Sequence, residues 1–201
     1  MHRQFPLVDL TPYSLTFCPP PGHQFSPSNT MPLTEEQKAR FQDFLQDSLE
    51  FYVSKALKLQ PTIRYYVLAL DCNIQENCEI CTALNDPKSF QDTAEKYYAD
   101  RDPEYLRTEI KYNSGDFNNS SARIEALDLF PNQILEDSQC QSILNELLKQ
   151  MVIFMENPKS SYHSIPKTDN FKVIVYDHDQ DPSVAFQAQH KLYPKPEFYL
   201  G

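Results

Sequence analysis

Glycine is nearly absent from this 201-residue chain, and tryptophan is absent altogether. The three glycines are Gly22, Gly115 and Gly201. The phosphate-binding loops of nucleotide-binding proteins need closely spaced glycines, because the backbone must approach the phosphate oxygens without a Cβ in the way. Glycines this far apart exclude both the Walker-type loop and the dinucleotide-binding loop.

Basic residues are in the minority, with 18 Lys and Arg against 28 Asp and Glu, for a formal net charge of −10. A nucleic-acid-binding protein neutralises phosphates with clustered Lys and Arg, which this chain does not supply. The same charge disfavours an anionic membrane surface. No stretch approaches the roughly 20 apolar residues of a membrane span, and the N-terminus lacks a signal-peptide pattern. We therefore expect a cytoplasmic protein with neither a nucleic-acid nor a membrane partner.

The first 30 residues differ in composition from the rest of the chain. They hold six of the sixteen prolines but only two charged side chains, Arg3 and Asp9, and they show no helical or strand periodicity. This pattern is typical of disorder. We predict a disordered, Pro-rich leader over residues 1–30 and one domain over residues 31–201, a length that suffices for a single hydrophobic core.

Two long amphipathic helices are predicted from apolar residues that recur at three- and four-residue spacing. The first is expected to begin at a capping box of Thr34 and Gln37 and to end before Pro61. The second is expected to begin at a capping box of Ser138 and Gln141. It carries the most apolar face of the chain: Ile143, Leu144, Leu147, Leu148, Met151, Val152 and Phe154.

Asp-Pro steps predict three further helix starts, because Asp caps a helix N-terminus and Pro suits the first helical position. These steps are Asp86-Pro87, Asp102-Pro103 and Asp181-Pro182. The closing segment, residues 193–201, is expected to be extended.

Four strands are predicted from apolar, β-branched runs or from alternation of apolar and polar residues. They cover residues 63–72, 78–84, 106–112 and 171–176. The first two are expected to form a β-hairpin. Helices and strands do not follow a regular βαβ order, so we predict an α+β domain with a mixed or antiparallel sheet of about four strands flanked by helices.

Three of the five cysteines, Cys72, Cys78 and Cys81, lie close together, and the last two have C-x-x-C spacing. Side chains alternate faces along a strand, so Cys78 and Cys81 would point opposite ways. A zinc site also needs about four ligands, and no second Cys or His pair stands at ligand spacing. We interpret these thiols as reduced and structural, while a metal or thiol site built from them remains an alternative.

The segment "DHDQD", residues 177–181, follows the last predicted strand. Its D-x-D-x-D pattern resembles a calcium loop, but Pro182 stands where that loop needs Gly and Ala188 where it needs Glu. No recognisable nucleophile motif accompanies the histidine. We expect a solvated turn that caps the next helix, and we take Asp177, His178 and Asp179 as candidate partner-binding residues.

The order of these elements resembles the bacterial family called domain of unknown function 4303. The resemblance covers roughly residues 34–193 and includes the segments "YYVLALDC", "CEICTALND", "EYLRTEIKY" and "FKVIVYDHD". It implies a small cytoplasmic protein, some of whose relatives are suspected to be immunity proteins that neutralise bacterial toxins. The resemblance brings no catalytic residues with it.

The absence of a catalytic motif and the net charge of −10 favour a non-enzymatic binding protein whose acidic surface meets a basic partner. The family resemblance implies that this protein is of the immunity type and that the partner is a toxin. We expect no cofactor. The alternative is a small metal- or thiol-dependent enzyme that uses Cys72, Cys78 and Cys81 or the Asp177–Asp181 cluster.

Overall fold

The computed structural model describes residues 33–74, 79–117, 127–130 and 135–200, so the predicted leader lies outside the described residues. A mixed sheet with the strand order β3-β2-β1-β4 forms the centre. β1 (Tyr65–Asn73) pairs antiparallel with β2 (Glu79–Asn85) and parallel with β4 (Lys167–Asp177). The two-residue β3 (Leu127–Asp128) lies beside β2 at one edge. The predicted hairpin of the first two strands is thereby confirmed.

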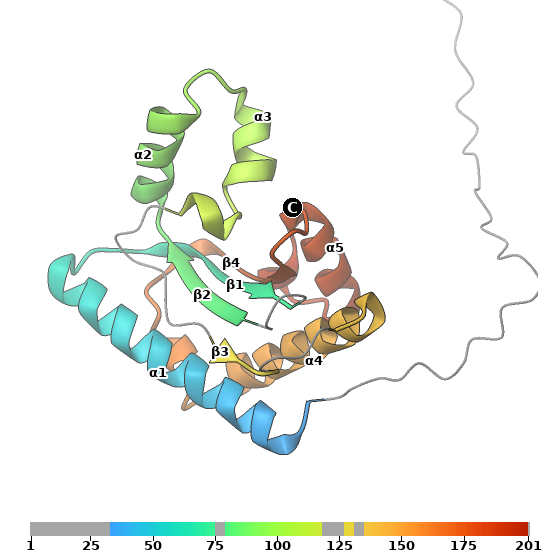
Figure 1. Ribbon diagram of the computed structural model, residues 1–201. Helices are drawn as coiled ribbons and strands as arrows, with labels where there is room; N and C mark the ends of the chain where they lie inside the picture. Colours follow the sequence, from blue (N-terminus) through green and yellow to red (C-terminus); the bar gives the residue numbers. More distant parts are fainter. Residues whose placement is uncertain (1–32, 75–78, 118–126, 131–134, 201) are drawn as a thin grey trace, which may run out of the picture.

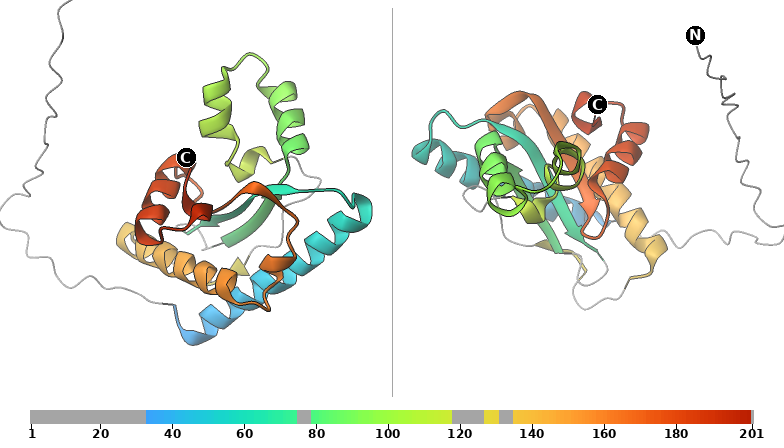
Figure 2. Two further views of the ribbon diagram at one scale, coloured as in Figure 1. Left: turned by 180° about the vertical axis from the view of Figure 1, so that it is seen from behind. Right: turned by 90° about the horizontal axis from the view of Figure 1, so that it is seen from above.

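Two long helices cover one face of the sheet. α1 (Glu35–Leu59) and α4 (Asp137–Glu156) lie below the sheet in Figure 1 and enclose the larger core. The view from behind shows the same layering (Figure 2). The core side chains include Phe41, Leu45, Leu49, Leu68, Leu70, Ile80, Leu84, Ile143, Leu147, Met151, Val173 and Val175.

Shorter helices lie on the opposite face. They are α2 (Pro87–Tyr97), α3 (Pro103–Tyr105), a π-helical turn (Leu106–Ile110) that continues α3, and α5 (Pro182–Leu192). A smaller core lies beneath them, with Val67, Ala69, Ile174, Tyr112 and Phe186 among its members. Single helical turns also occur at Ser114–Asp116, Ser161–Ser164 and Pro196–Phe198. The sheet is thus buried on both faces.

The capping signals explain where most helices begin. Thr34 and Gln37 form the predicted capping box of α1. The side chains of Asp86, Asp102 and Asp181 each accept a hydrogen bond from a backbone N–H at the start of α2, α3 and α5. The predicted start of α4 is wrong by two residues, because Glu136 and Gln139, instead of Ser138 and Gln141, form its capping box.

The α+β class and the mixed sheet flanked by helices are confirmed, but about four strands slightly overstates the sheet. Among the described residues, only β1, β2 and β4 are full strands, and β3 contributes two residues. The predicted strand 106–112 is wrong. Its first five residues are π-helical, because the Asp102 cap starts a helix that runs on past one turn.

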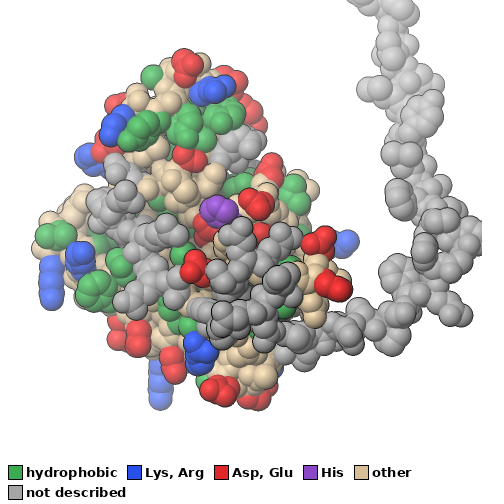
Figure 3. All heavy atoms as spheres, in the orientation of Figure 1, with side chains coloured by type: hydrophobic (Ala, Val, Ile, Leu, Met, Phe, Trp, Pro, Cys, Tyr) green, Lys and Arg blue, Asp and Glu red, His purple; other side chains and the backbone are tan. Residues whose placement is uncertain are grey.

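The hairpin of α2 and α3 forms a lobe that projects from the sheet (Figure 1). Hydrophobic side chains gather on this lobe among charged ones (Figure 3). Tyr97 is 64% exposed, with Lys96 Nζ 4.7 Å from its ring centre. The Arg101 guanidinium lies 5.1 Å from the Tyr105 ring centre, so cations cover part of this aromatic surface.

Candidate functional site

The predicted cluster Asp177, His178 and Asp179 lies where β4 ends and the turn to α5 begins. His178 continues the strand pairing, since its backbone N–H donates to the Cys72 carbonyl at 3.0 Å. Successive residues at a strand end point to opposite faces. The structure therefore separates the cluster: Asp177 and Asp179 line a hollow beside α4, whereas the His178 side chain contacts Asp71 of β1.

The hollow beside α4 has a volume of about 290 Å³, and we call it the acidic hollow. The first turns of α4 form one wall, and the β4–α5 turn forms the other. The lining residues are Asp137, Cys140, Gln141, Leu144, Asp177, Asp179 and Gln180. Three carboxylates from two separate elements thus line one open depression.

Two carboxylates of the acidic hollow, those of Asp177 and Asp179, form no ion pair with a described side chain. Burial raises the pKa of Asp177, and the nearby carboxylates of Asp179 and Asp71 raise it further. The Gln180 Oε1 atom is buried without a hydrogen-bond partner in the described chain. A cation that entered the hollow would offset the repulsion between the carboxylates.

The thiol in the acidic hollow is not activated. Cys140 lies in the first turns of α4, where the helix dipole would ordinarily favour a thiolate. Burial nevertheless raises the pKa of the Cys140 thiol, and the charge of Asp177 raises it further. Cys140 therefore stays a neutral thiol at pH 7 and is a poor nucleophile.

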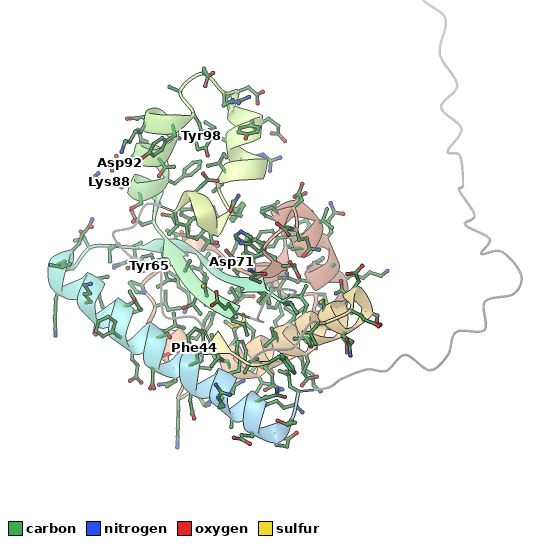
Figure 4. The ribbon with its side chains drawn as sticks, viewed as in Figure 1. Phe44, Tyr65, Asp71, Lys88, Asp92 and Tyr98 are labelled. Carbon is green, nitrogen blue, oxygen red and sulfur yellow. The ribbon has the colours of Figure 1, made fainter. Side chains whose placement is uncertain are left out.

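Asp71 anchors a second polar cluster on the opposite face of the sheet, below α5 and the α2–α3 lobe (Figure 4). The Ser114 hydroxyl donates to Asp71 Oδ2 at 2.5 Å. His178 Nδ1 lies 3.0 Å from Asp71 Oδ1. The Tyr176 hydroxyl donates to Ser114 Oγ at 2.9 Å and accepts from the Ser114 backbone N–H at 2.9 Å. We call these four residues the Asp71 network.

The proton positions in the Asp71 network follow from its partners. An ionised carboxylate can only accept, so the Nδ1 atom of His178 carries a proton and donates it to Asp71. Burial raises the pKa of Tyr176, which keeps that hydroxyl a donor. Ser114 donates to the carboxylate instead of to the imidazole. The network therefore lacks the serine-to-histidine hydrogen bond that activates the nucleophile of a catalytic triad.

The ion pair with Asp71 should make His178 a pH-dependent stabiliser. The hydrogen bond that His178 donates to Asp71 and the charge of Asp71 raise the pKa of His178, and the charges of Asp179 and Asp177 also raise it. The ion pair stabilises the folded protein fully at pH values below about 6.5, the ordinary histidine pKa. This stabilisation is lost as the pH rises through the raised pKa of His178. Histidine NMR titration should therefore give a lower His178 pKa in Asp71→Asn than in the wild type.

Asp116→Asn is the matched control for this titration, because Asp116 accepts a hydrogen bond from Tyr98 and does not contact His178. The same His178 pKa in the wild type and in Asp71→Asn would show that the ion pair does not form in solution.

The cysteine cluster is only partly within the described residues, because Cys78 lies outside them. Cys81 pairs with Asp71 and Cys72 pairs with Ile80 across the hairpin. Directly paired residues share a face, so Cys72 and Cys81 lie on opposite faces of the sheet. These two thiols cannot ligate one ion. Within the described chain, no three His, Cys, Asp or Glu side chains are grouped so as to hold a metal ion.

Sequence reasoning missed several residues of the acidic hollow and of the Asp71 network. Asp71 and His178 are 107 positions apart, and Ser114 lies 43 positions from Asp71. The parallel pairing of β1 with β4 brings the ends of these strands together. Asp137 precedes the helix start predicted at Ser138 and belongs to no motif of the sequence. The one local signal for Asp71 is a charged residue near the end of an otherwise apolar strand.

No family model, curated protein or solved structure matches this chain. The resemblance to domain of unknown function 4303 therefore stays a prediction. None of the described helices combines the length and the apolar character that a membrane span requires.

Proposed function

We propose that this protein is a non-enzymatic binding protein of the cytoplasm whose acidic surface holds a basic protein partner. The observation that carries the proposal is the acidic hollow, where Asp177 and Asp179 have no cationic partner among the described residues. The net charge of −10 supports it, because a strong field steers an oppositely charged partner toward the surface. That the partner is a toxin rests on the family resemblance alone.

The partner group that suits the acidic hollow is a Lys or Arg side chain. The carboxylates of Asp137, Asp177 and Asp179 line the hollow from two walls. Among the described residues, no three His, Cys, Asp or Glu side chains are close enough together to hold a metal ion. A guanidinium or ammonium group presents several N–H donors and can reach separated acceptors at once.

The alternative of a metal- or thiol-dependent enzyme has less support. The Asp71 network directs Ser114 away from His178, and the Cys140 thiol has a raised pKa. Elemental analysis of the purified full chain tests this alternative directly. Stoichiometric zinc or iron would favour the enzyme over the binding protein.

Charge reversal in the acidic hollow should weaken partner binding about tenfold or more, because the partner's cation would then meet a like charge. The variant is Asp177→Lys/Asp179→Lys in the full chain. The matched control is Asp43→Lys/Asp47→Lys, which makes the same charge change on the exposed side of α1. Proteins captured from native cells by immobilised wild type and by each variant are compared by quantitative mass spectrometry.

We expect a basic protein that the wild type and the control capture and the hollow variant loses. Equal losses from both variants would mean that only the overall charge matters and the hollow is not the contact. Equal capture by all three forms, or the recovery of free monomer alone, would contradict the proposal.

A further inference from the structure

A second pocket, of about 410 Å³, lies beside α5 and shares no lining residue with the acidic hollow. We call it the α5 pocket. Its walls come from the π-helical turn, α5 and the C-terminal segment. The lining residues are Arg107, Ser183, Phe186, Gln187, His190, Tyr199 and Leu200. The volume falls within the range of small-molecule sites, roughly 300 to 1,000 Å³.

One wall of this pocket is a single face of α5, as helical periodicity shows. Ser183, Phe186, Gln187 and His190 recur at three- and four-residue spacing, so they share one face of α5. Phe186 is buried in the smaller core and holds that face in place. The floor and one wall of the pocket are therefore set by packed elements, which is typical of a preformed site.

The C-terminal segment supplies the apolar wall. Tyr199 is 54% exposed, and its ring centre lies 4.9 Å from that of His190. Leu200 packs against the smaller core. Phe198, the last residue of the preceding helical turn, is fully buried and fixes the segment. Tyr199 and Leu200 offer aromatic and aliphatic surface to a ligand, and the buried Phe186 supports the pocket from below.

Arg107 supplies a cation at the rim. Its guanidinium donates to Glu104 through Nε at 3.1 Å and through Nη2 at 2.7 Å, whereas Nη1 makes no hydrogen bond to a described residue. The ion pair fixes the side chain and leaves donors available. Arg107 also lies in the π-helical turn, a rare conformation that is frequent at functional sites.

His190 supplies an unsatisfied polar atom. Its Nδ1 is buried and has no hydrogen-bond partner among the described residues. A buried ring nitrogen without a partner is costly unless a ligand or a water satisfies it. The α5 pocket thus combines an apolar wall, a cationic rim and a polar atom that lacks a partner.

From this combination we infer that the α5 pocket binds a small aromatic carboxylate. The ring would stack on Tyr199, and the carboxylate would accept from Nη1 of the Arg107 guanidinium. Glu104 balances the charge of Arg107, so this hydrogen bond, and not a net positive field, would hold the anion. The Nη1 donor lies beside apolar surface, so ring and carboxylate must be joined in one ligand.

The probe is 3-phenylpropionate, titrated into the full chain by calorimetry and by amide NMR. We expect saturable binding with a Kd of about 1 mM or tighter. The amide 3-phenylpropanamide should bind about tenfold or more weakly, because it cannot form the charge-assisted hydrogen bond. Tyr199→Ala should weaken the acid and the amide by similar factors, since it removes apolar wall and no charge.

Arg107→Gln should reduce the affinity for 3-phenylpropionate about tenfold or more and leave the amide nearly unaffected. Arg64→Gln is the control, because Arg64 is exposed and does not line the pocket. The amide spectrum of each variant checks that it is folded.

The assignment would be overturned if the binding did not saturate by about 10 mM probe or if the acid and the amide bound with equal affinity. An unchanged affinity in folded Arg107→Gln would overturn it too. An equal loss in Arg64→Gln would also overturn it, because bulk charge would then explain the binding.

Discussion

Replacing Phe198 with alanine should lower the free energy of unfolding by about 3 to 5 kcal/mol, the usual cost of removing a fully buried aromatic ring. Phe198 has no exposed surface and belongs to the larger core with residues of α1 and α4. Its removal leaves a cavity that packed neighbours fill only in part. Because a domain has only about 5 to 15 kcal/mol of stability, this residue near the C-terminus should be among the most sensitive positions.

Urea unfolding of the full chain at pH 7 measures the effect. Leu59→Ala is the control, because Leu59 is also apolar but is 75% exposed at the end of α1, and its loss should cost little. A cost below about 1 kcal/mol for Phe198→Ala would show that the C-terminal segment does not pack on the domain in solution. The wall of the α5 pocket would then lose its support as well.

The C-terminal segment also shows what local sequence patterns do not convey. Two prolines, Pro194 and Pro196, and the lack of periodicity predicted an extended end. Pro196–Phe198 instead forms a single helical turn, and the Lys172 ammonium donates to the Pro196 carbonyl at 2.8 Å. A lone Phe becomes a core residue through a contact that is distant in sequence, and no periodic pattern records such a contact.

The long helices were predictable because several local signals agree. In α4, every residue of the predicted apolar face, from Ile143 to Phe154, is buried. In α1, the capping box at Thr34 and Gln37 marks the start, and the buried positions recur at the predicted spacing. Caps and periodicity act within a few residues, so the sequence contains them without knowledge of the fold.

The strand prediction for residues 106–112 is wrong because the sequence pattern fits both a strand and a helix. Leu106, Ile110 and Tyr112 alternate with charged residues, but Leu106 and Ile110 are also four apart, which is a helical spacing. Asp102-Pro103 gives a strong helix start just before it. The start signal prevailed over the short alternation, and the resulting π-helical turn carries Arg107 to the α5 pocket.

The candidate sites were predictable only in part, because some of their residues come from distant parts of the chain. The sequence pointed to Asp177, His178 and Asp179 as a cluster, and they follow one another where β4 ends, but their side chains belong to two separate sites. Their partners come from elsewhere: Asp137 from α4 for the acidic hollow, and Asp71 from β1 for His178. Only the pairing of β1 with β4 and the packing of α4 on the sheet bring these groups into contact.

The second large effect is expected from Asp71→Ala, which should lower the free energy of unfolding by about 2 to 3 kcal/mol, in the range for losing a charge-assisted hydrogen bond inside a protein. The Asp71 side chain is only 14% exposed and accepts from the Ser114 hydroxyl at 2.5 Å. Removal of the carboxylate leaves that hydroxyl without its acceptor. The ion pair with His178 adds little, because the His178 side chain is 59% exposed.

Asp92→Ala is the control for Asp71→Ala, because Asp92 forms an ion pair with Lys88 on the exposed surface of α2 and its loss should cost less than about 1 kcal/mol. Ser114→Ala should in turn cost less than Asp71→Ala, since the carboxylate keeps His178 as a donor. In Asp71→Ala, the Ser114 and Tyr176 hydroxyls share one hydrogen bond, and one of their two protons has no acceptor in the network. Urea unfolding of the three variants measures this order. Equal costs for Asp71→Ala and Asp92→Ala would show that the Asp71 network does not join β1, the Ser114 turn and β4 in the folded protein.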